Sequence, residues 1–155
     1  MFKNQGELPD EAKLFLRIHK THLNESQPTD TALVMRDEPK LSVDWEELTT
    51  AEESRARGKV PQDNGVAVAI SGLLRQKMRS PLGDILLKSI THDPVEGDEN
   101  TKPNESHSLI IPVSYEQSKK VKKTGKYDYY FDNETLATIK DNKLFTVVIE
   151  PTKNG

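Results

Sequence analysis

Apolar and polar residues alternate from Lys13 to His19, and this pattern limits what the chain can fold into more than any other feature. Side chains in a β-strand point alternately to opposite faces, so the pattern is typical of a strand that is buried on one face. The residues of the apolar face are Leu14, Leu16 and Ile18. Arg17 and His19 share the opposite face with Phe15. A strand of this kind belongs to a sheet that packs on a core.

Further short apolar runs predict the other strands. We expect strands at 66–70, 85–92, 106–113 and 144–149, and two short strands at 32–35 and 41–45 that are near enough in sequence to form a hairpin. Helices are predicted at 51–57, 73–78, 115–123 and 133–140. The first of them has the clearest start, because Thr50 and Glu53 have the spacing of a capping box.

Strands outnumber helices in this order, and most links between strands are short. We therefore predict one α+β domain over residues 1–155, with a mainly antiparallel or mixed sheet and a few short helices packed on it. A doubly wound nucleotide-binding fold is disfavoured, because neither glycine-rich phosphate loop occurs in the chain. The predicted core consists of Leu14, Leu16, Ile18, Val66, Val68, Ile70, Leu86, Ile90, Leu109, Ile111, Val147 and Ile149.

The segment 93–105 differs from the rest of the chain. It contains five acidic residues together with Pro, Gly and Asn, and hardly any apolar residue. We predict a long acidic loop that is solvated and mobile.

Composition excludes several classes of function. The formal net charge is −3, which argues against a strongly basic nucleic-acid-binding protein. The chain has no cysteine, so disulfides, cysteine-based zinc sites and thiol nucleophiles are ruled out. No apolar run is long enough to span a membrane, and the first residues do not resemble a signal peptide. We expect a soluble cytoplasmic protein that does not bind a membrane.

Histidine is the best candidate for acid–base chemistry in this chain. Arg17 and His19 lie about 6 to 7 Å apart on one face of their strand, a spacing that suits a phosphate or carboxylate substrate. His107 begins another predicted strand and would join them if the two strands were neighbours. The competing interpretation is that Arg17 and His19 lie on a solvated face of an edge strand.

Two other kinds of chemistry find less support. No combination of His, Asp and Glu has the spacing of a known metal site, so we predict neither a metal nor another cofactor. The Gly-x-Ser-x-Gly motif of many serine hydrolases is absent as well.

A lysine-rich segment lies between Tyr115 and the aromatic residues Tyr127, Tyr129, Tyr130 and Phe131. Lysines beside aromatic residues can contact phosphates and stack on bases, but a lysine-rich helix on an acidic protein is usually a solvated face. We predict that this surface contacts a protein partner rather than a nucleic acid. Its residues are Lys119, Lys120, Lys122, Lys123 and Lys126.

Several short motifs resemble those of a type of small, uncharacterised bacterial protein. They are Leu-Phe-Leu-Arg-Ile-His at 14–19, Leu-Ser-Val-Asp-Trp at 41–45 with Thr-Thr-Ala-Glu-Glu at 49–53, Asn-Gly-Val at 64–66, His-Asp-Pro at 92–94 and Asn-Glu-Ser-His at 104–107. The resemblance covers residues 8–111 and implies no activity.

Two functions follow from these observations. The first is a non-catalytic binding or accessory module that recognises another macromolecule through the lysine-rich surface. The alternative is a small metal-independent enzyme that acts on a phosphorylated or nucleotide substrate. In that enzyme Arg17 would hold an anionic oxygen, while His19 and His107 would exchange protons. The sequence indicates no particular oligomeric state.

Overall fold

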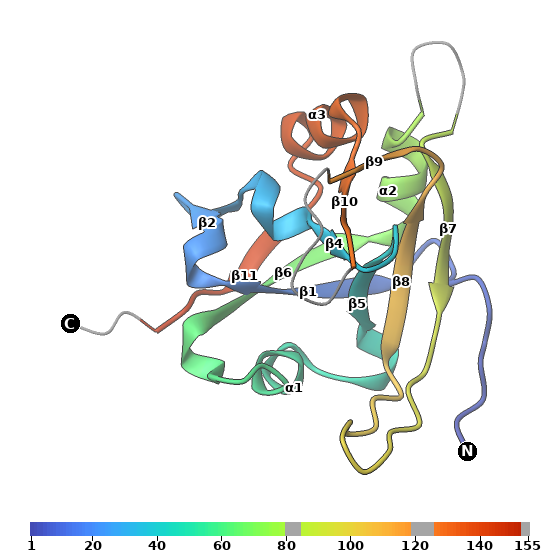
Figure 1. Ribbon diagram of the computed structural model, residues 1–155, viewed down its shortest axis with the longest axis vertical. Coiled ribbons are helices and arrows are strands. Elements are labelled where there is room, and N and C mark those ends of the chain that lie inside the picture. Colours follow the sequence, from blue (N-terminus) through green and yellow to red (C-terminus); the bar gives the residue numbers. More distant parts are fainter. Residues whose placement is uncertain (80–84, 119–125, 153–155) are drawn as a thin grey trace.

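A six-stranded antiparallel sheet forms the centre of the protein in this computed structural model, which describes residues 1–79, 85–118 and 126–152 (Figure 1). The strand order is β11-β6-β1-β5-β8-β7. The strands are β1 (Lys13–His19), β5 (Leu41–Trp45), β6 (Asn64–Ile70), β7 (Leu87–His92), β8 (His107–Pro112) and β11 (Thr146–Ile149). This architecture confirms the predicted α+β class.

Smaller elements surround the sheet. The helices are α1 (Ala51–Ala56), α2 (Ser71–Lys77) and α3 (Asn133–Asp141), and single 3-10 turns occur at Lys20–His22, Asp30–Leu33, Glu46–Leu48 and Pro61–Asp63. One small sheet contains β4 (Met35–Arg36), β10 (Asp128–Phe131) and β9 (Tyr115–Gln117), and another contains β2 (Leu23–Asn24) and β3 (Gln27–Pro28). Among the described residues, no helix is long and apolar enough to cross a membrane.

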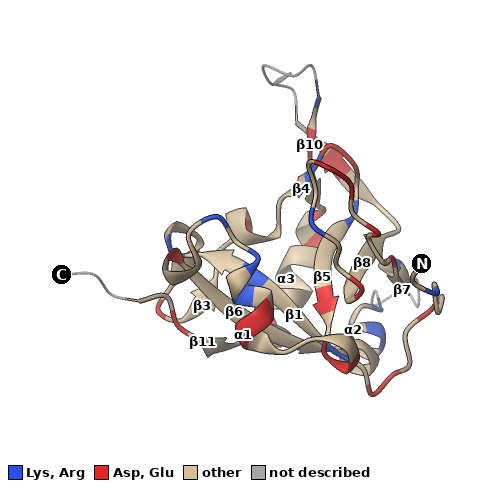
Figure 2. Ribbon diagram, turned by 90° about the horizontal axis from the view of Figure 1, so that it is seen from below, with Lys and Arg blue, Asp and Glu red and all other residues tan. Residues whose placement is uncertain are grey.

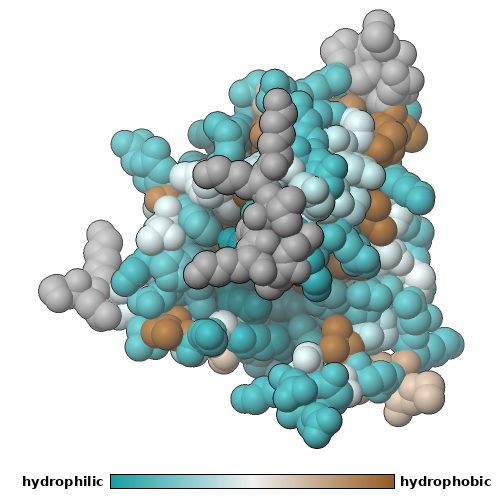
Figure 3. All heavy atoms as spheres, in the orientation of Figure 1, coloured by the Kyte–Doolittle hydropathy of each residue, from teal (hydrophilic) through white to brown (hydrophobic). Residues whose placement is uncertain are grey.

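Different helices pack on the two faces of the large sheet. Figure 1 shows α3 on one side of β1 and β6 and α1 on the other side. The main core lies on the α3 side, where Leu14 and Leu16 pack with Phe131 and Phe145. Figure 2 views the molecule from the α1 side and shows acidic and basic residues interspersed over the elements. The face in Figure 3 is mostly hydrophilic, with small and separate hydrophobic patches.

The main core uses the face opposite to the predicted one in two strands. In β8, Ile110 belongs to the main core, whereas the predicted residues Leu109 and Ile111 do not. In β6, Ala67 and Ala69 pair with Leu16 and Leu14 and belong to the main core. Val66 is buried too, but it pairs with Arg17 and therefore faces the α1 side. Because all the residues from Val66 to Ile70 are apolar, alternation could not indicate which face is turned to the core.

Two predicted elements were wrong. The segments at 32–35 and 41–45 do not form a hairpin, because β4 pairs with β10 whereas β5 pairs with β1 and β8, and the first of them begins within the 3-10 turn Asp30–Leu33. The segment predicted as a helix from residue 115 begins as strand β9, which pairs with β10. The predicted start of α1 is confirmed, since the Thr50 hydroxyl accepts a hydrogen bond from the Glu53 amide at 3.1 Å.

The acidic segment 93–105 connects β7 to β8. Val95 and Asn104 form an antiparallel bridge within it, with backbone hydrogen bonds of 2.9 and 2.8 Å in the two directions. The Asp98 carboxylate accepts hydrogen bonds from the amides of Asn100 and Thr101. This segment therefore has internal order near its two ends and at its tip, and its mobility stays a prediction.

Candidate functional site

A cleft opens where β1 and β5 separate. These two strands pair at only two positions, Leu14 with Trp45 and Phe15 with Asp44. Beyond the second pair lies a cavity of about 310 Å³, which is lined by residues of both strands, of the segment 32–36 and of β8. Its polar and charged lining residues are Arg17, Arg36, Lys40, Ser42, Asp44, Asn104 and His107.

Strand alternation explains why four of these side chains share one sheet face. Phe15 pairs with Asp44, and Asp44 pairs with His107 on the next strand. Arg17 is two residues from Phe15 on β1, and Ser42 is two residues from Asp44 on β5, so both lie on the same face as those residues. This is the α1 side of the sheet, opposite the main core.

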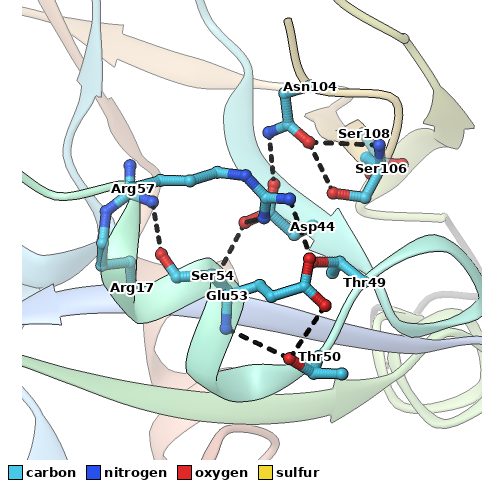
Figure 4. A network of polar contacts seen from close by, with 10 residues as sticks. All are labelled: Arg17, Asp44, Thr49, Thr50, Glu53, Ser54, Arg57, Asn104, Ser106 and Ser108. Carbon is cyan, nitrogen blue, oxygen red and sulfur yellow. Dashed lines mark hydrogen bonds and ion pairs between the residues drawn. The ribbon is translucent and has the colours of Figure 1, made fainter. Parts of the chain in front are cut away.

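Asp44 is the centre of a buried polar network beside the cleft (Figure 4). Only 6% of this residue is exposed. Its Oδ2 accepts hydrogen bonds from Ser54 Oγ at 2.7 Å and from Arg57 Nη1 at 3.1 Å, and its Oδ1 accepts one from Asn104 Nδ2 at 2.9 Å. The network joins β5 to α1 and to the turn before β8, so it holds the walls of the cleft together.

Asn104 extends this network toward β8. Its Oδ1 accepts hydrogen bonds from the amide and the hydroxyl of Ser106, at 3.1 and 2.6 Å. Ser106 is completely buried. The contacts hold the turn immediately before His107.

His107 lies between an acidic residue and a serine. Its Nδ1 is 2.8 Å from the carbonyl oxygen of Asp93 and 3.2 Å from the Asp93 carboxylate, and its Nε2 is 3.1 Å from Ser42 Oγ. A carbonyl oxygen can only accept, so Nδ1 carries a proton and donates to Asp93. In the neutral ring Nε2 then has no proton, and it accepts the hydrogen bond from the Ser42 hydroxyl.

Arg17 brings a positive charge to the cleft. Its Nη1 donates to the carbonyl oxygen of Ser54 in α1 at 2.8 Å, which fixes the side chain against that helix. Loss of hydration lowers the pKa of Arg17, Asp44 acts in the opposite direction, and Arg57 lowers the pKa further. Arginine stays protonated in proteins nonetheless, so the cation is permanent.

Positive charge in the cleft exceeds the negative charge. The carboxylate of Asp44 already forms an ion pair with Arg57 at 3.1 Å. Lys40 forms an ion pair with the exposed Glu38, whereas Arg17 and Arg36 form no ion pair with any residue that the structure describes. The cleft is therefore suited to an anionic ligand.

Two of the three predicted catalytic residues, Arg17 and His107, line this cleft. His19 is not among the lining residues; it pairs with Asn64, and its Nδ1 is 2.8 Å from Thr21 Oγ1. Its position on β1 is four residues beyond Phe15, or about 13 Å along the strand, and two strand spacings from β8 add about 10 Å across the sheet. One substrate atom cannot reach both histidine rings over such a separation.

The structure describes only one residue of the predicted partner surface, Lys126. Lys119, Lys120, Lys122 and Lys123 lie outside the described residues. Lys126 is exposed, and its Nζ is 3.7 Å from the Asp37 carboxylate.

Sequence reasoning missed Ser42 and Asp93. The alternation of Leu41, Val43 and Trp45 was a signal for Ser42, because it places Ser42 and Asp44 together on the other face. Asp93 had no comparable signal, since it belongs to the segment that was predicted to be a solvated loop. No group of three or more His, Asp or Glu side chains within the described part of the chain has an arrangement that could hold a metal ion.

Comparisons with models of known protein families, with curated proteins and with solved structures find no match to this chain. The geometry of the cleft is therefore the basis for a functional assignment.

Proposed function

We propose that the protein is a small enzyme that acts on a phosphorylated substrate in the cleft between β1 and β5. The observation that carries this proposal is the presence of Arg17 and His107 in the lining of one cavity. Its volume of about 310 Å³ lies at the lower end of the range of small-molecule sites. The substrate, or the part of it that enters the cleft, is therefore small.

Arg17 and His107 have different roles in this proposal. Arg17 binds the oxygens of the phosphoryl group, because a guanidinium offers several N–H donors to such an anion. Arg36 and Lys40 add positive charge to the same cavity. His107 exchanges protons through Nε2, the ring nitrogen that faces the cleft.

The proposal keeps part of the enzyme predicted from the sequence. It assigns no role to His19, because the register of β1 separates this residue from His107. A single histidine can act first as base and then as acid, so the chemistry needs no second imidazole.

A binding module remains the competing function. Four of the five lysines of its predicted contact surface lie outside the described residues. The cleft, in contrast, combines a cavity, a fixed arginine and an oriented histidine.

Calorimetric titration with inorganic phosphate tests the binding part of the proposal. We expect saturable binding to the wild-type protein and about tenfold or more weaker binding to Arg17→Ala, because a hydrogen bond to a charged group contributes about 1.5 to 3 kcal/mol. Arg79→Ala is the matched control, since Arg79 is an exposed arginine that does not line the cleft. Equal loss of binding in both variants would contradict the assignment of Arg17.

Hydrolysis of p-nitrophenyl phosphate tests the catalytic part. Removal of a general acid–base group slows a reaction about 100-fold or more, so His107→Ala should lose activity by that factor. His19→Ala should keep the wild-type rate. An unchanged rate in His107→Ala would exclude the proposed role of this residue.

A further inference from the structure

We propose that Ser42 is the nucleophile of this enzyme and that the reaction passes through a phosphoserine intermediate. The inference rests on the proposed function and names the group that attacks phosphorus. Ser42 Oγ is 3.1 Å from the His107 ring nitrogen that has no proton in the neutral tautomer. A serine that donates to such a nitrogen has the arrangement of an activated nucleophile.

The opposite side of the histidine ring completes this arrangement. His107 Nδ1 donates to the Asp93 carbonyl oxygen at 2.8 Å, and the Asp93 carboxylate lies 3.2 Å from the same nitrogen. The carbonyl fixes the tautomer, while the carboxylate stabilises the positive charge that the ring acquires when it takes the serine proton. Asp93 is therefore a positioning residue.

Accessibility distinguishes Ser42 from its neighbours. Ser54, Ser106 and Ser108 are completely buried. Their hydroxyls donate to Asp44, to Asn104 and to the Ser106 carbonyl oxygen, respectively. Ser42 is exposed on β5, and it lines the same cavity as Arg17. It can therefore reach a phosphoryl group that Arg17 holds.

The proposed reaction has two steps. In the first, Ser42 Oγ forms a bond to phosphorus, the bond from phosphorus to the leaving oxygen breaks, and His107 Nε2 takes the serine proton and gives it to the leaving group. In the second step, a water molecule attacks phosphorus while His107 Nε2 takes a proton from that water molecule. The bond from phosphorus to Ser42 then breaks, and the proton returns to Oγ. The net reaction of the two steps is the hydrolysis of a phosphoester by one water molecule.

A fluorophosphonate probe tests the nucleophile directly. Attack by Ser42 forms a bond from Oγ to phosphorus, fluoride leaves, and His107 takes the proton. We expect one covalent adduct by intact mass, located on Ser42 by peptide mapping and absent in Ser42→Ala. His107→Ala should react about 100-fold more slowly, because it lacks the general base.

Two further variants control the labelling experiment. Ser26→Ala should react like the wild-type protein, because Ser26 is an exposed serine outside the cleft that donates to Glu150. Asp93→Ala keeps the backbone carbonyl that orients the ring and removes only the carboxylate. It should react more slowly than the wild-type protein while the ring ¹⁵N shifts of His107 still show protonated Nδ1. Wild-type labelling in Asp93→Ala would overturn the role of its carboxylate.

Oxygen exchange tests the intermediate without knowledge of the leaving group. Formation of phosphoserine from inorganic phosphate releases water, and its hydrolysis by bulk water returns phosphate with a new oxygen. We expect the wild-type protein to remove ¹⁸O from labelled phosphate, and Ser42→Ala to have lost this activity although it still binds phosphate.

The outcomes separate this inference from the proposed function. If phosphate binding depends on Arg17 but Ser42 is neither labelled nor needed for exchange, the covalent step is wrong and the proposed function stands. If Ser42 is labelled but phosphate neither binds nor exchanges, the nucleophile stands and the phosphorylated substrate class is wrong. If phosphate does not bind and Ser42 is not labelled, both proposals are wrong.

Discussion

Asp44 shows how one buried carboxylate positions a surface cleft. Both of its oxygens accept hydrogen bonds, and the donors come from two segments: Ser54 and Arg57 from α1 and its C-cap, and Asn104 from the turn before β8. A buried charge is costly unless it is paired and hydrogen-bonded, and Asp44 meets both conditions. Its side chain therefore links the strand that carries Ser42 to the helix that holds Arg17.

Substitution of Asp44 should destabilise the fold strongly. Asp44→Ala leaves the partly buried Arg57 without its counter-ion, so the free energy of unfolding should fall by about 3 to 5 kcal/mol. Urea denaturation measures this change. Asp30→Ala is the control, because its ion pair with Lys140 is exposed and such pairs contribute about 1 kcal/mol or less. Similar effects of the two substitutions would contradict the structural role of Asp44.

Single residues also show where sequence reasoning ends. Alternation correctly placed Arg17 and His19 on one face of β1, because a strand repeats every two residues. It could not indicate that β5 lies between β1 and β8. That neighbour brings Arg17 and His107 to one cleft and provides Ser42, while it leaves His19 at a distant position along β1.

At the scale of elements, helix α3 depends on its first residues. Asp132 caps the helix, since its Oδ1 accepts a hydrogen bond from the Thr135 amide at 2.8 Å and its Oδ2 accepts one from the Ser114 hydroxyl. Burial by itself would raise the pKa of Asp132, but the hydrogen bonds from Ser114 and Thr135 together outweigh this effect and lower it. The folded state therefore favours the ionised carboxylate.

This cap makes the stability of the protein depend on pH. The pKa of Asp132 in the folded state lies below the ordinary value of about 3.9, so its stabilisation is fully present above that value and is lost as the pH falls through the folded-state pKa. Asp132→Ala should reduce the free energy of unfolding at pH 7 by about 1 kcal/mol. Asp132→Asn keeps an acceptor without the charge, so it should lose less stability than the wild-type protein between pH 5 and pH 3. Equal losses in urea denaturation over that range would contradict this role.

The elements that were predicted correctly have strong local signals. Strand β1 has strict alternation, and α1 has its capping box. Strand β9 has no such signal, because Tyr115, Glu116 and Gln117 are all exposed and do not alternate between apolar and polar residues. The lysines that follow favoured a helix on composition alone.

At the scale of the whole molecule, the cleft results from the way the sheet is assembled. Strands β1 and β5 pair over two residues and then separate, while each continues its pairing with the strand on its other side. The separation exposes side chains from the middle of the sheet instead of its edge. The sequence predicted the class of fold, but this divergence depends on contacts between distant segments.

A phosphate titration followed by ¹H–¹⁵N correlation spectroscopy tests the central claim most directly, since it locates an anion on the intact wild-type protein. Our account predicts saturable shift changes that are largest at Arg17, Ser42 and His107, with little change at His19. The absence of saturable changes, or changes centred on residues outside the cleft, would contradict it.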